Sequence, residues 1–142
     1  MSRLPEEIPQ ATFHKRVVHA TKGEMWVTLT TDDLFKDKTV VIFGLPGAFT
    51  PTCSGQQLPG FESSYYDFRQ QGIDDIYCFS VNDSFVMEEW KEKLGIVNVK
   101  LIPDGSGEFT IKMGMDVRKD NLGFGMRSWR YAAVVTDGTI IK

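Results

Sequence analysis

The sequence predicts an α/β fold organised as one domain. Short runs rich in β-branched and aromatic residues alternate along the chain with segments of helical periodicity, which is typical of a layered sheet covered by helices. Gly, Pro, Asn and Asp residues separate these runs. The chain has 142 residues, of which 42% are hydrophobic and 25% charged, so it can bury a core of its own. We therefore expect a single domain over residues 1–142.

The expected strands are short and bounded by turn residues. Residues 1–13 show no clear pattern and are predicted to form an irregular lead-in. Strands are predicted at 24–29, 38–45, 76–81, 99–102 and 129–135. Asp137-Gly138 predicts a hairpin turn into a last arm of residues 139–142. No helix follows this arm, and we expect the natural domain to continue beyond Lys142.

Helices are expected between these strands. Residues 30–33 offer capping chemistry for a short helical turn at 34–35. A helix after Cys53 is predicted to carry an apolar stripe and to stop at Gly72. Capping residues at 82–84 predict a helix that reaches Leu94, and 108–115 is a further candidate. The stripe consists of Phe61, Tyr65 and Phe68.

Composition excludes several classes of function. The net charge of −3 leaves no electrostatic footprint for nucleic acid or an anionic membrane, and the apolar runs are too short to span a bilayer. The N-terminus carries acids and prolines where a signal peptide needs an apolar stretch, so we expect a cytoplasmic protein. The two cysteines, Cys53 and Cys78, form no CxxC motif, and no ligands cluster for a metal site.

The segment 46–53, Pro-Gly-Ala-Phe-Thr-Pro-Thr-Cys, places Cys53 between a predicted strand and a predicted helix. A cysteine at a helix N-terminus gains thiolate character from unpaired N–H groups and the helix dipole. Thr50 can form a hydrogen bond at the same turn, and Pro46 stiffens the loop. Arg130, in the predicted strand 129–135, is a candidate counter-ion. Arg127 is either solvated or a more distant partner.

These residues resemble the peroxiredoxin family. Pro46, Thr50 and Cys53 fit its P-x-x-x-T-x-x-C signature, and Arg130 stands where the family carries its active-site arginine. The resemblance covers residues 8–142. Within the family, the sequence particularly resembles the atypical fifth subfamily and its bacterial members, including those fused to a glutaredoxin. The resemblance implies a thioredoxin-like fold, with a central mixed sheet flanked by helices, and a thiol peroxidase that needs no metal or organic cofactor.

The resemblance also implies roles for individual residues. The thiolate of Cys53 is expected to attack the O–O bond of hydrogen peroxide or an alkyl hydroperoxide, which leaves a sulfenic acid. Thr50 and Arg130 are expected to stabilise the thiolate and orient the peroxide, while Pro46 shields the sulfur. Four further residues are candidates for the substrate pocket, although the aromatic ones are equally plausible in a core or a subunit contact. They are Phe49, Phe85, Trp90 and Arg127.

The second half of the reaction needs an external thiol. Cys78 lies in the middle of a predicted strand and is expected to be buried and inert, so no resolving cysteine stands in these residues. We expect a one-cysteine cycle completed by glutathione, glutaredoxin or thioredoxin, and a homodimer by analogy with the family. The alternative function is a redox sensor or holdase that is oxidised at Cys53 without turnover.

Overall fold

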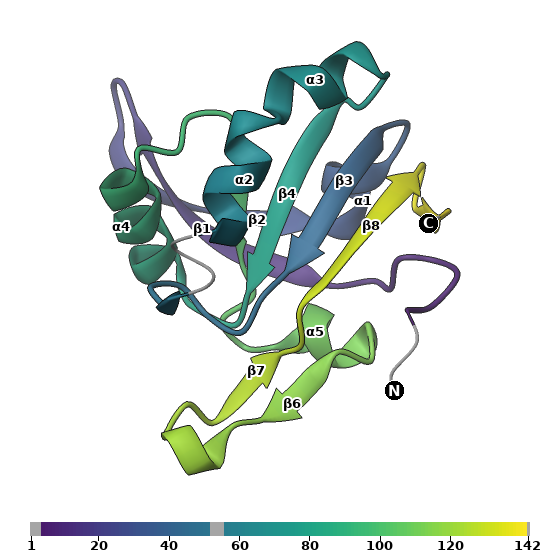
Figure 1. Ribbon diagram of the computed structural model, residues 1–142. Coiled ribbons are helices and arrows are strands. Elements are labelled where there is room, and N and C mark those ends of the chain that lie inside the picture. Colours follow the sequence, from purple (N-terminus) through teal and green to yellow (C-terminus); the bar gives the residue numbers. More distant parts are fainter. Residues whose placement is uncertain (1–3, 52–55, 142) are drawn as a thin grey trace.

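A five-stranded mixed sheet forms the centre of the molecule (Figure 1). The structure is a computed structural model that describes residues 4–51 and 56–141. The strands, in spatial order, are β5 (Lys100–Pro103), β4 (Asp75–Ser80), β3 (Thr39–Gly44), β8 (Tyr131–Thr136) and β9 (Thr139–Ile140). The first three are parallel, whereas β8 is antiparallel to β3 and β9 is antiparallel to β8. The predicted α/β class with a central mixed sheet is confirmed.

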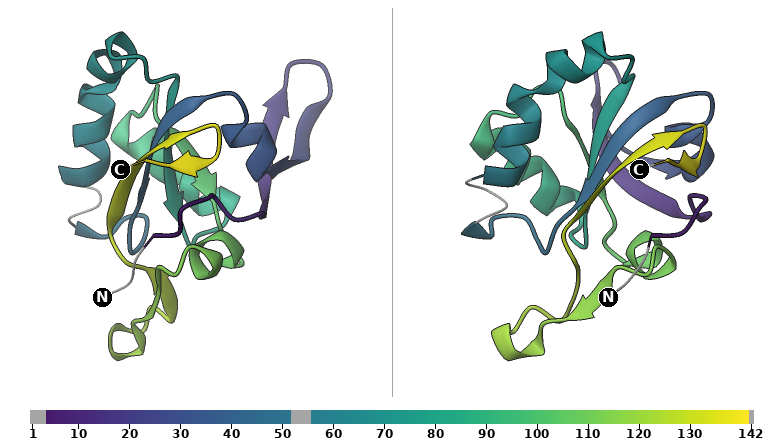
Figure 2. Two further views of the ribbon diagram at one scale, coloured as in Figure 1. Left: turned by 90° about the vertical axis from the view of Figure 1, so that its right-hand side faces the viewer. Right: turned by 45° about the vertical axis from the view of Figure 1, so that its right-hand side comes forward.

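Helices cover both faces of this sheet (Figure 2). Side chains of β3 alternate between two cores: Val40 and Ile42 face one, and Val41 and Phe43 face the other. Both faces are buried, so the strand reads as a continuous apolar run. The first core is covered by α1 (Thr31–Phe35) and α5 (Glu108–Lys112), and the second by α2 (Leu58–Ser63), α3 (Tyr65–Gln70) and α4 (Ser84–Leu94).

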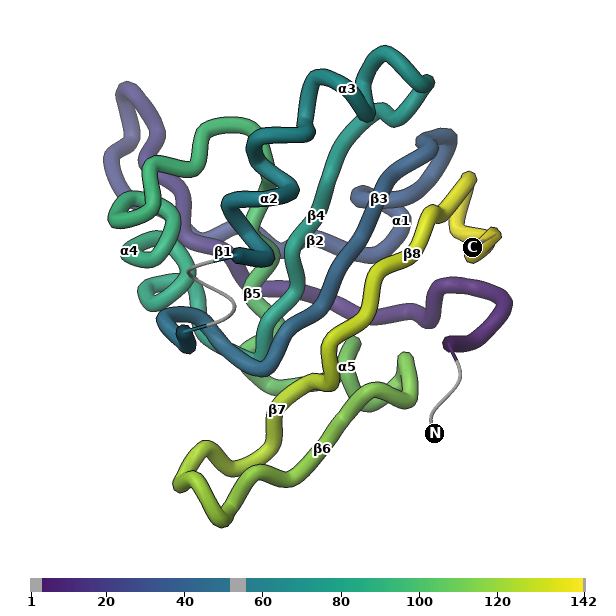
Figure 3. The backbone as a smooth tube through the Cα atoms, in the orientation of Figure 1, coloured from purple at the N-terminus to yellow at the C-terminus, as the bar shows by residue number. Residues whose placement is uncertain are grey.

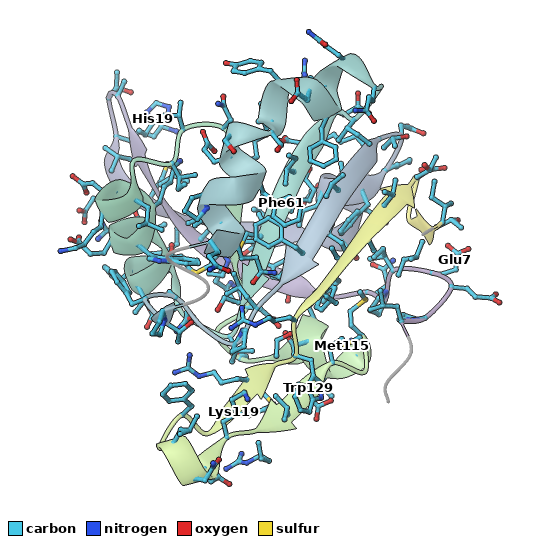
Figure 4. The ribbon with its side chains drawn as sticks, viewed as in Figure 1. Glu7, His19, Phe61, Met115, Lys119 and Trp129 are labelled. Atoms are coloured by element: carbon cyan, nitrogen blue, oxygen red, sulfur yellow. The ribbon has the colours of Figure 1, made fainter. Side chains whose placement is uncertain are left out.

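The apolar stripe predicted after Cys53 packs against the second core. Phe61 of α2 stacks on Phe43 with ring centroids 4.0 Å apart, and Figure 4 shows its ring against the sheet. Tyr65 and Phe68 pack against the same core. The single helix expected here is instead divided at Ser64 into α2 and α3.

The ends of the helices follow local chemistry. In α4 the Asp83 carboxylate accepts from the Val86 N–H, as the capping residues predict, and Gly95 ends the helix in the left-handed conformation. The predicted helix 108–115 is wrong in length, because α5 ends at Lys112 and Gly114 turns the chain with a φ of 72°. Within the described chain, every helix is too short or too polar to cross a membrane.

An antiparallel hairpin of β1 (Thr12–His19) and β2 (Gly23–Thr30) packs beside the sheet and projects from the body (Figure 2). The expected lead-in is wrong at its end, because β1 begins at Thr12. Polar residues in β1 obscure its alternation, and the strand is stabilised by pairing along its whole length with β2. The backbone before it is also ordered, since the Ile8 N–H donates to the Gly138 carbonyl at 2.8 Å.

The strand predicted over 129–135 begins later than expected, because a second hairpin precedes it and β8 starts only at Tyr131. The hairpin consists of β6 (Asp116–Arg118) and β7 (Met126–Ser128), joined through a 3-10 turn at Asp120–Leu122. The chain bends after β7 and enters the central sheet at Tyr131 (Figure 3). The Trp129 N–H donates to the carbonyl of Met115, which directly precedes β6, at 2.8 Å. The backbone of Trp129 is thus bound to the hairpin segment and not to the central sheet. Arg130 therefore lies between two strands rather than within one.

Candidate active site

The loop that follows β3 lies beside the start of β8. Gly44 is paired with Tyr131 across the antiparallel β3–β8 ladder, which brings residues 45–51 close to residues 126–130. The loop leaves the sheet at the carboxyl end of a parallel strand, the usual place for a site in an open α/β sheet. A Cβ at Gly44 would collide with the Tyr131 ring, so close contact between the two strands requires glycine here.

The loop makes a tight turn at Thr50. The Thr50 hydroxyl donates to the Gly47 carbonyl at 2.7 Å, and the Thr50 N–H points to the same oxygen at 3.4 Å. Phe49 has a φ of 66°, which is unusual for a bulky residue and costs about 1–2 kcal/mol. Pro46 and Ala48 are buried, whereas Phe49 is 46% exposed. The turn therefore holds the Thr50 side chain in a defined and strained arrangement.

Arg130 is exposed and reaches toward α2. Its Nη1 donates to Oε1 of Gln57 at 2.9 Å, and Nε2 of Gln57 lies 3.5 Å from the Gly44 carbonyl. The sequence predicted that Arg130 would lie within a strand over residues 129–135. The structure instead places it just before β8, where it is not confined by the ladder. Gln57 was not singled out from the sequence, although its place four residues after Cys53 would put both on one face of a helix.

Arg127 contacts the loop from β7. Its Nη1 donates to the Pro46 carbonyl at 3.1 Å, and its Nε donates to the Phe124 carbonyl at 3.2 Å. The guanidinium also lies over the Phe124 ring at 5.1 Å from the centroid. A Cβ at Gly47 would collide with this guanidinium. Arg127 is therefore bound to the loop, and its part in the reaction stays a prediction.

Asn82 is a contact that the sequence did not predict. It was assigned only to helix capping, yet its Oδ1 accepts from the Ala48 N–H at 3.0 Å and from the Ser80 hydroxyl at 2.5 Å. Asn82 follows β4, which lies next to β3, so the end of one strand reaches the loop of the other. A polar residue directly after a buried strand was the available signal.

Cys53, the predicted nucleophile, lies outside the described residues. The other three principal candidates are described, and the structure places Pro46, Thr50 and Arg130 at one end of the central sheet. In the chain, Cys53 stands between Thr50 and Gln57.

Two of the aromatic pocket candidates, Phe49 and Trp90, lie side by side, whereas Phe85 lies elsewhere. Trp90 is fully buried in the second core, with its ring 6.4 Å from that of Phe49. Phe85 is 54% exposed and packs beside Trp26 of β2, under the guanidinium of Arg16. Phe49 is thus the aromatic candidate that belongs to the loop itself.

Two buried ionisable groups, Asp104 after β5 and Tyr131 opposite Gly44, lie at the same end of the sheet as the loop. Burial raises the pKa of Asp104, although hydrogen bonds from the Thr110 side chain and from the backbone N–H groups of Thr110 and Phe109 oppose this shift. Burial, together with the charge of Asp104, also raises the pKa of Tyr131 well above its usual value. The Tyr131 hydroxyl has no hydrogen-bond partner among the described residues. Because its pKa is raised, the Tyr131 hydroxyl stays protonated at neutral pH.

Metal binding has no candidate among residues 4–51 and 56–141, where no three His, Cys, Asp or Glu side chains gather around one point.

The hairpin of β6 and β7 packs against the residue that follows it. There Lys119 lies over the Trp129 ring, with Nζ 5.3 Å from its centroid (Figure 4). Trp129 is exposed and directly precedes Arg130 in the chain.

Comparison with known proteins defines the class. The Redoxin family model matches residues 6–142. A peroxiredoxin of Rhizobium etli is 57% identical over 141 residues, which cover 96% of this chain and 79% of that protein. The hybrid peroxiredoxin hyPrx5 of Haemophilus influenzae is 50% identical over 137 residues, or 96% of this chain and 55% of that protein. The solved 1-Cys peroxiredoxin of Plasmodium falciparum, 35% identical, superposes with a TM-score of 0.88 over 96% of this chain and 81% of that one.

The mixed sheet with its helical layers is thus the thioredoxin-like fold of the redoxins. The chain belongs to the peroxiredoxins, a family within that class, and resembles its type-five members. It is a thiol peroxidase, an oxidoreductase that uses a thiol to reduce peroxides.

Proposed function

We propose that this chain reduces hydrogen peroxide and alkyl hydroperoxides at Cys53. The Cys53 thiolate attacks one oxygen of the peroxide, the O–O bond breaks, and the leaving oxygen takes a proton to become water or an alcohol. The sulfur gains the other oxygen as a sulfenic acid. The observation that supports this proposal is the strained loop of Thr50 together with the nearby cation of Arg130, both adjoining the segment that carries Cys53.

The hydrogen bonds of Thr50 suggest how it would act. A hydroxyl has one proton, and that of Thr50 is directed to the Gly47 carbonyl. Its oxygen lone pairs can therefore accept the proton of a bound hydroperoxide. Arg130 would stabilise the thiolate and the charge that develops on the leaving oxygen. Pro46 would shield the sulfur, and Phe49 would contribute the wall nearest the loop. Arg127 is assigned to the loop rather than to the substrate.

The sulfenic acid would be reduced by an external thiol. Cys78 is fully buried in the middle of β4, which supports the prediction that it does not act as a resolving cysteine. In our proposal one thiol displaces water from the sulfenic acid to give a mixed disulfide. A second thiol then releases Cys53 and leaves as the other half of a new disulfide. Glutathione, with or without glutaredoxin, and thioredoxin are the candidate reductants. The similarity to a 1-Cys peroxiredoxin favours this cycle.

We further propose one peroxiredoxin domain over residues 1–142, a cytoplasmic location, and a homodimer. The dimer is supported by the exposed aromatic side chains near the loop, which a partner subunit would cover. They are Phe49, Phe124 and Trp129. Analytical ultracentrifugation of the chain, with Trp129→Ser as the matched variant, tests this proposal.

The activity is tested by stopped-flow mixing of the reduced protein with hydrogen peroxide. The wild-type thiol should react at least about a thousandfold faster than free cysteine, and Cys53→Ser should show no turnover with glutathione and glutaredoxin. Cys78→Ala should keep full turnover, because the cycle does not use this thiol. Turnover in Cys53→Ser would refute the proposal. Oxidation of Cys53 in a single event, with no recycling by any of the thiols, would instead indicate the redox sensor or holdase.

A further inference from the structure

The backbone of the loop is held by two side chains from outside the loop and by one within it. Residues 46–48 are buried, so their backbone polar groups need hydrogen-bond partners. The Pro46 carbonyl accepts from Arg127 at 3.1 Å, and the Ala48 N–H donates to Asn82 at 3.0 Å. The Gly47 carbonyl between them accepts from the Thr50 hydroxyl. Successive groups of one short loop are therefore bound by three different side chains.

We propose that Asn82 and Arg127 are positioning residues that hold this loop in the geometry that the peroxide reaction requires. The inference rests on the proposed function, because it concerns how the loop presents Thr50 and leads the chain to Cys53. Neither residue need touch the peroxide. Each acts through a main-chain group of the loop.

Asn82 is well placed to act as a fixed acceptor. Its Oδ1 accepts from the hydroxyl of Ser80, which is fully buried, as well as from the Ala48 N–H. The Ser80 carbonyl in turn accepts from the Asp104 N–H at 2.9 Å. The amide of Asn82 is thus oriented by the Ser80 hydroxyl at the end of β4, and the Ser80 backbone is bound in turn to the segment after β5. Asn82 therefore fixes the Ala48 backbone relative to the end of β4 in the central sheet.

Arg127, in β7, contributes a charged hydrogen-bond donor to the Pro46 carbonyl. A hydrogen bond from a charged group is stronger than one between neutral groups. The guanidinium is held in turn by the Phe124 carbonyl and ring, so it is not a free surface charge. It also lies against Gly47, where an added Cβ would meet the guanidinium and displace it. Arg127 therefore binds the first half of the loop and packs against it.

The strain at Phe49 explains why such support is needed. A bulky residue with a φ of 66° persists only where its surroundings determine the backbone. Phe49 follows Ala48, which Asn82 binds, and precedes Thr50. Loss of either positioning residue should let the turn relax and move the Thr50 hydroxyl. A reaction that depends on aligned donors and acceptors is sensitive to such a shift.

The test compares two reactions of the same thiol. Oxidation by hydrogen peroxide needs the loop geometry, whereas alkylation by iodoacetamide needs only the thiolate. Both rates are measured over a range of pH, so that pH-independent rate constants can be compared. The Cys53→Ser chain supplies the background from Cys78. The variants are Asn82→Ala and Arg127→Gln.

Each variant has a matched control. Asn82→Asp keeps the acceptor oxygen and should recover most of the lost rate. Asn98→Ala removes an asparagine that donates to Glu62 and lies outside the loop, and Arg118→Gln removes an exposed arginine from the same hairpin as Arg127. Melting temperatures of all variants separate loss of folding from loss of positioning.

We expect Asn82→Ala and Arg127→Gln to lower the pH-independent rate constant with peroxide by about tenfold or more, with alkylation unchanged to within about twofold. Asn98→Ala and Arg118→Gln should react like the wild type. Full peroxide reactivity in Asn82→Ala and Arg127→Gln, or an equal fall in both reactions, overturns the inference while the peroxidase function stands. A wild-type thiol no faster than free cysteine overturns the proposed function and the inference together.

Discussion

Arg130 and Gln57 lie 73 residues apart in the sequence, and the guanidinium of Arg130 donates a hydrogen bond of 2.9 Å to the amide oxygen of Gln57. Gln57 immediately precedes α2, and its amide nitrogen lies 3.5 Å from the Gly44 carbonyl at the end of β3. The cation is therefore linked to the end of the strand that leads into the loop and to the start of the helix that follows. This link ties Arg130 to residues that precede and follow segment 52–55 in the sequence.

Replacement of Arg130 should remove most of the activity and little of the stability. Arg130→Met is expected to lower kcat/KM for hydrogen peroxide by about a hundredfold or more, because a charged donor is lost. Its melting temperature should stay near that of the wild type, since Arg130 is exposed. Arg130→Lys keeps the charge without the planar fork and should fall between the two. Steady-state kinetics of the three proteins check this, and an Arg130→Met variant with wild-type kcat/KM would contradict it.

Gln57→Leu tests the link itself. It retains the bulk of the side chain and removes both of its hydrogen bonds, so Arg130 keeps its charge and loses one partner. We expect a loss in kcat/KM of about tenfold or less, smaller than that of Arg130→Met. An equal or greater loss in Gln57→Leu would mean that Gln57 does more than orient the arginine.

Thr50 offers a matched pair of substitutions. Thr50→Val removes the hydroxyl that donates to the Gly47 carbonyl and should cost about 1 kcal/mol in the free energy of unfolding. It also removes the proposed acceptor for the peroxide, so kcat/KM should fall by about a hundredfold. Thr50→Ser keeps the hydroxyl and should retain most of both. Urea unfolding and peroxide kinetics measure the two effects, and equal kinetics of the Val and Ser variants would exclude the hydroxyl.

Gly44 should tolerate no side chain. A Cβ there would collide with the ring of Tyr131 on the paired strand, so Gly44→Ala should lower the free energy of unfolding by about 1–3 kcal/mol. Gly60 in α2 is the matched control, since a Cβ there meets no atom within 4 Å. Gly60→Ala should be neutral or stabilising by up to about 1 kcal/mol. Denaturant unfolding of both variants measures the two changes. Equal stability of Gly44→Ala and Gly60→Ala would show that the contact with Tyr131 does not exclude a side chain at Gly44.

Glu62 of α2 makes a pH-dependent contribution to stability. Burial alone would raise its pKa, but hydrogen bonds from the N–H groups of Val99, Asn98 and Val97 outweigh this and hold the pKa below its usual value. A carboxyl with a lowered pKa in the folded state stabilises the fold above the pKa that it has in the unfolded chain. That stability is lost as the pH falls through the folded-state pKa.

Glu62→Gln should therefore be less stable than the wild type at neutral pH. We expect a difference of about 1–2 kcal/mol, given the partial exposure of the carboxylate. The difference should shrink as the pH falls below the usual pKa of a glutamate, about 4.3, and should vanish only once the pH has passed the lowered folded-state pKa. Urea unfolding of the two proteins across this range measures it. A difference that stays constant with pH would show that shape rather than charge is responsible.

Much of the fold could be predicted because the signals are local. The continuous apolar run of β3, the Asp83 cap and the Asp137-Gly138 turn all act within a few residues of the chain. The failures occurred where distant segments decide. β1 carries mixed polar residues, and its strand conformation comes from pairing with β2 and from the bond between the Arg16 N–H and the Ser84 hydroxyl.

The site divides in the same way. The sequence by itself determined the loop of Pro46, Thr50 and Cys53, because the spacing of these residues is a property of one short segment. Only the tertiary structure decided where Arg130 stands and which side chains bind the loop. Gln57, Asn82 and Arg127 come from different elements, and each reaches the end of β3 or its loop because β3 lies between β4 and β8. Hydrogen bonds across such distances depend on strand order, which no local pattern of residues encodes.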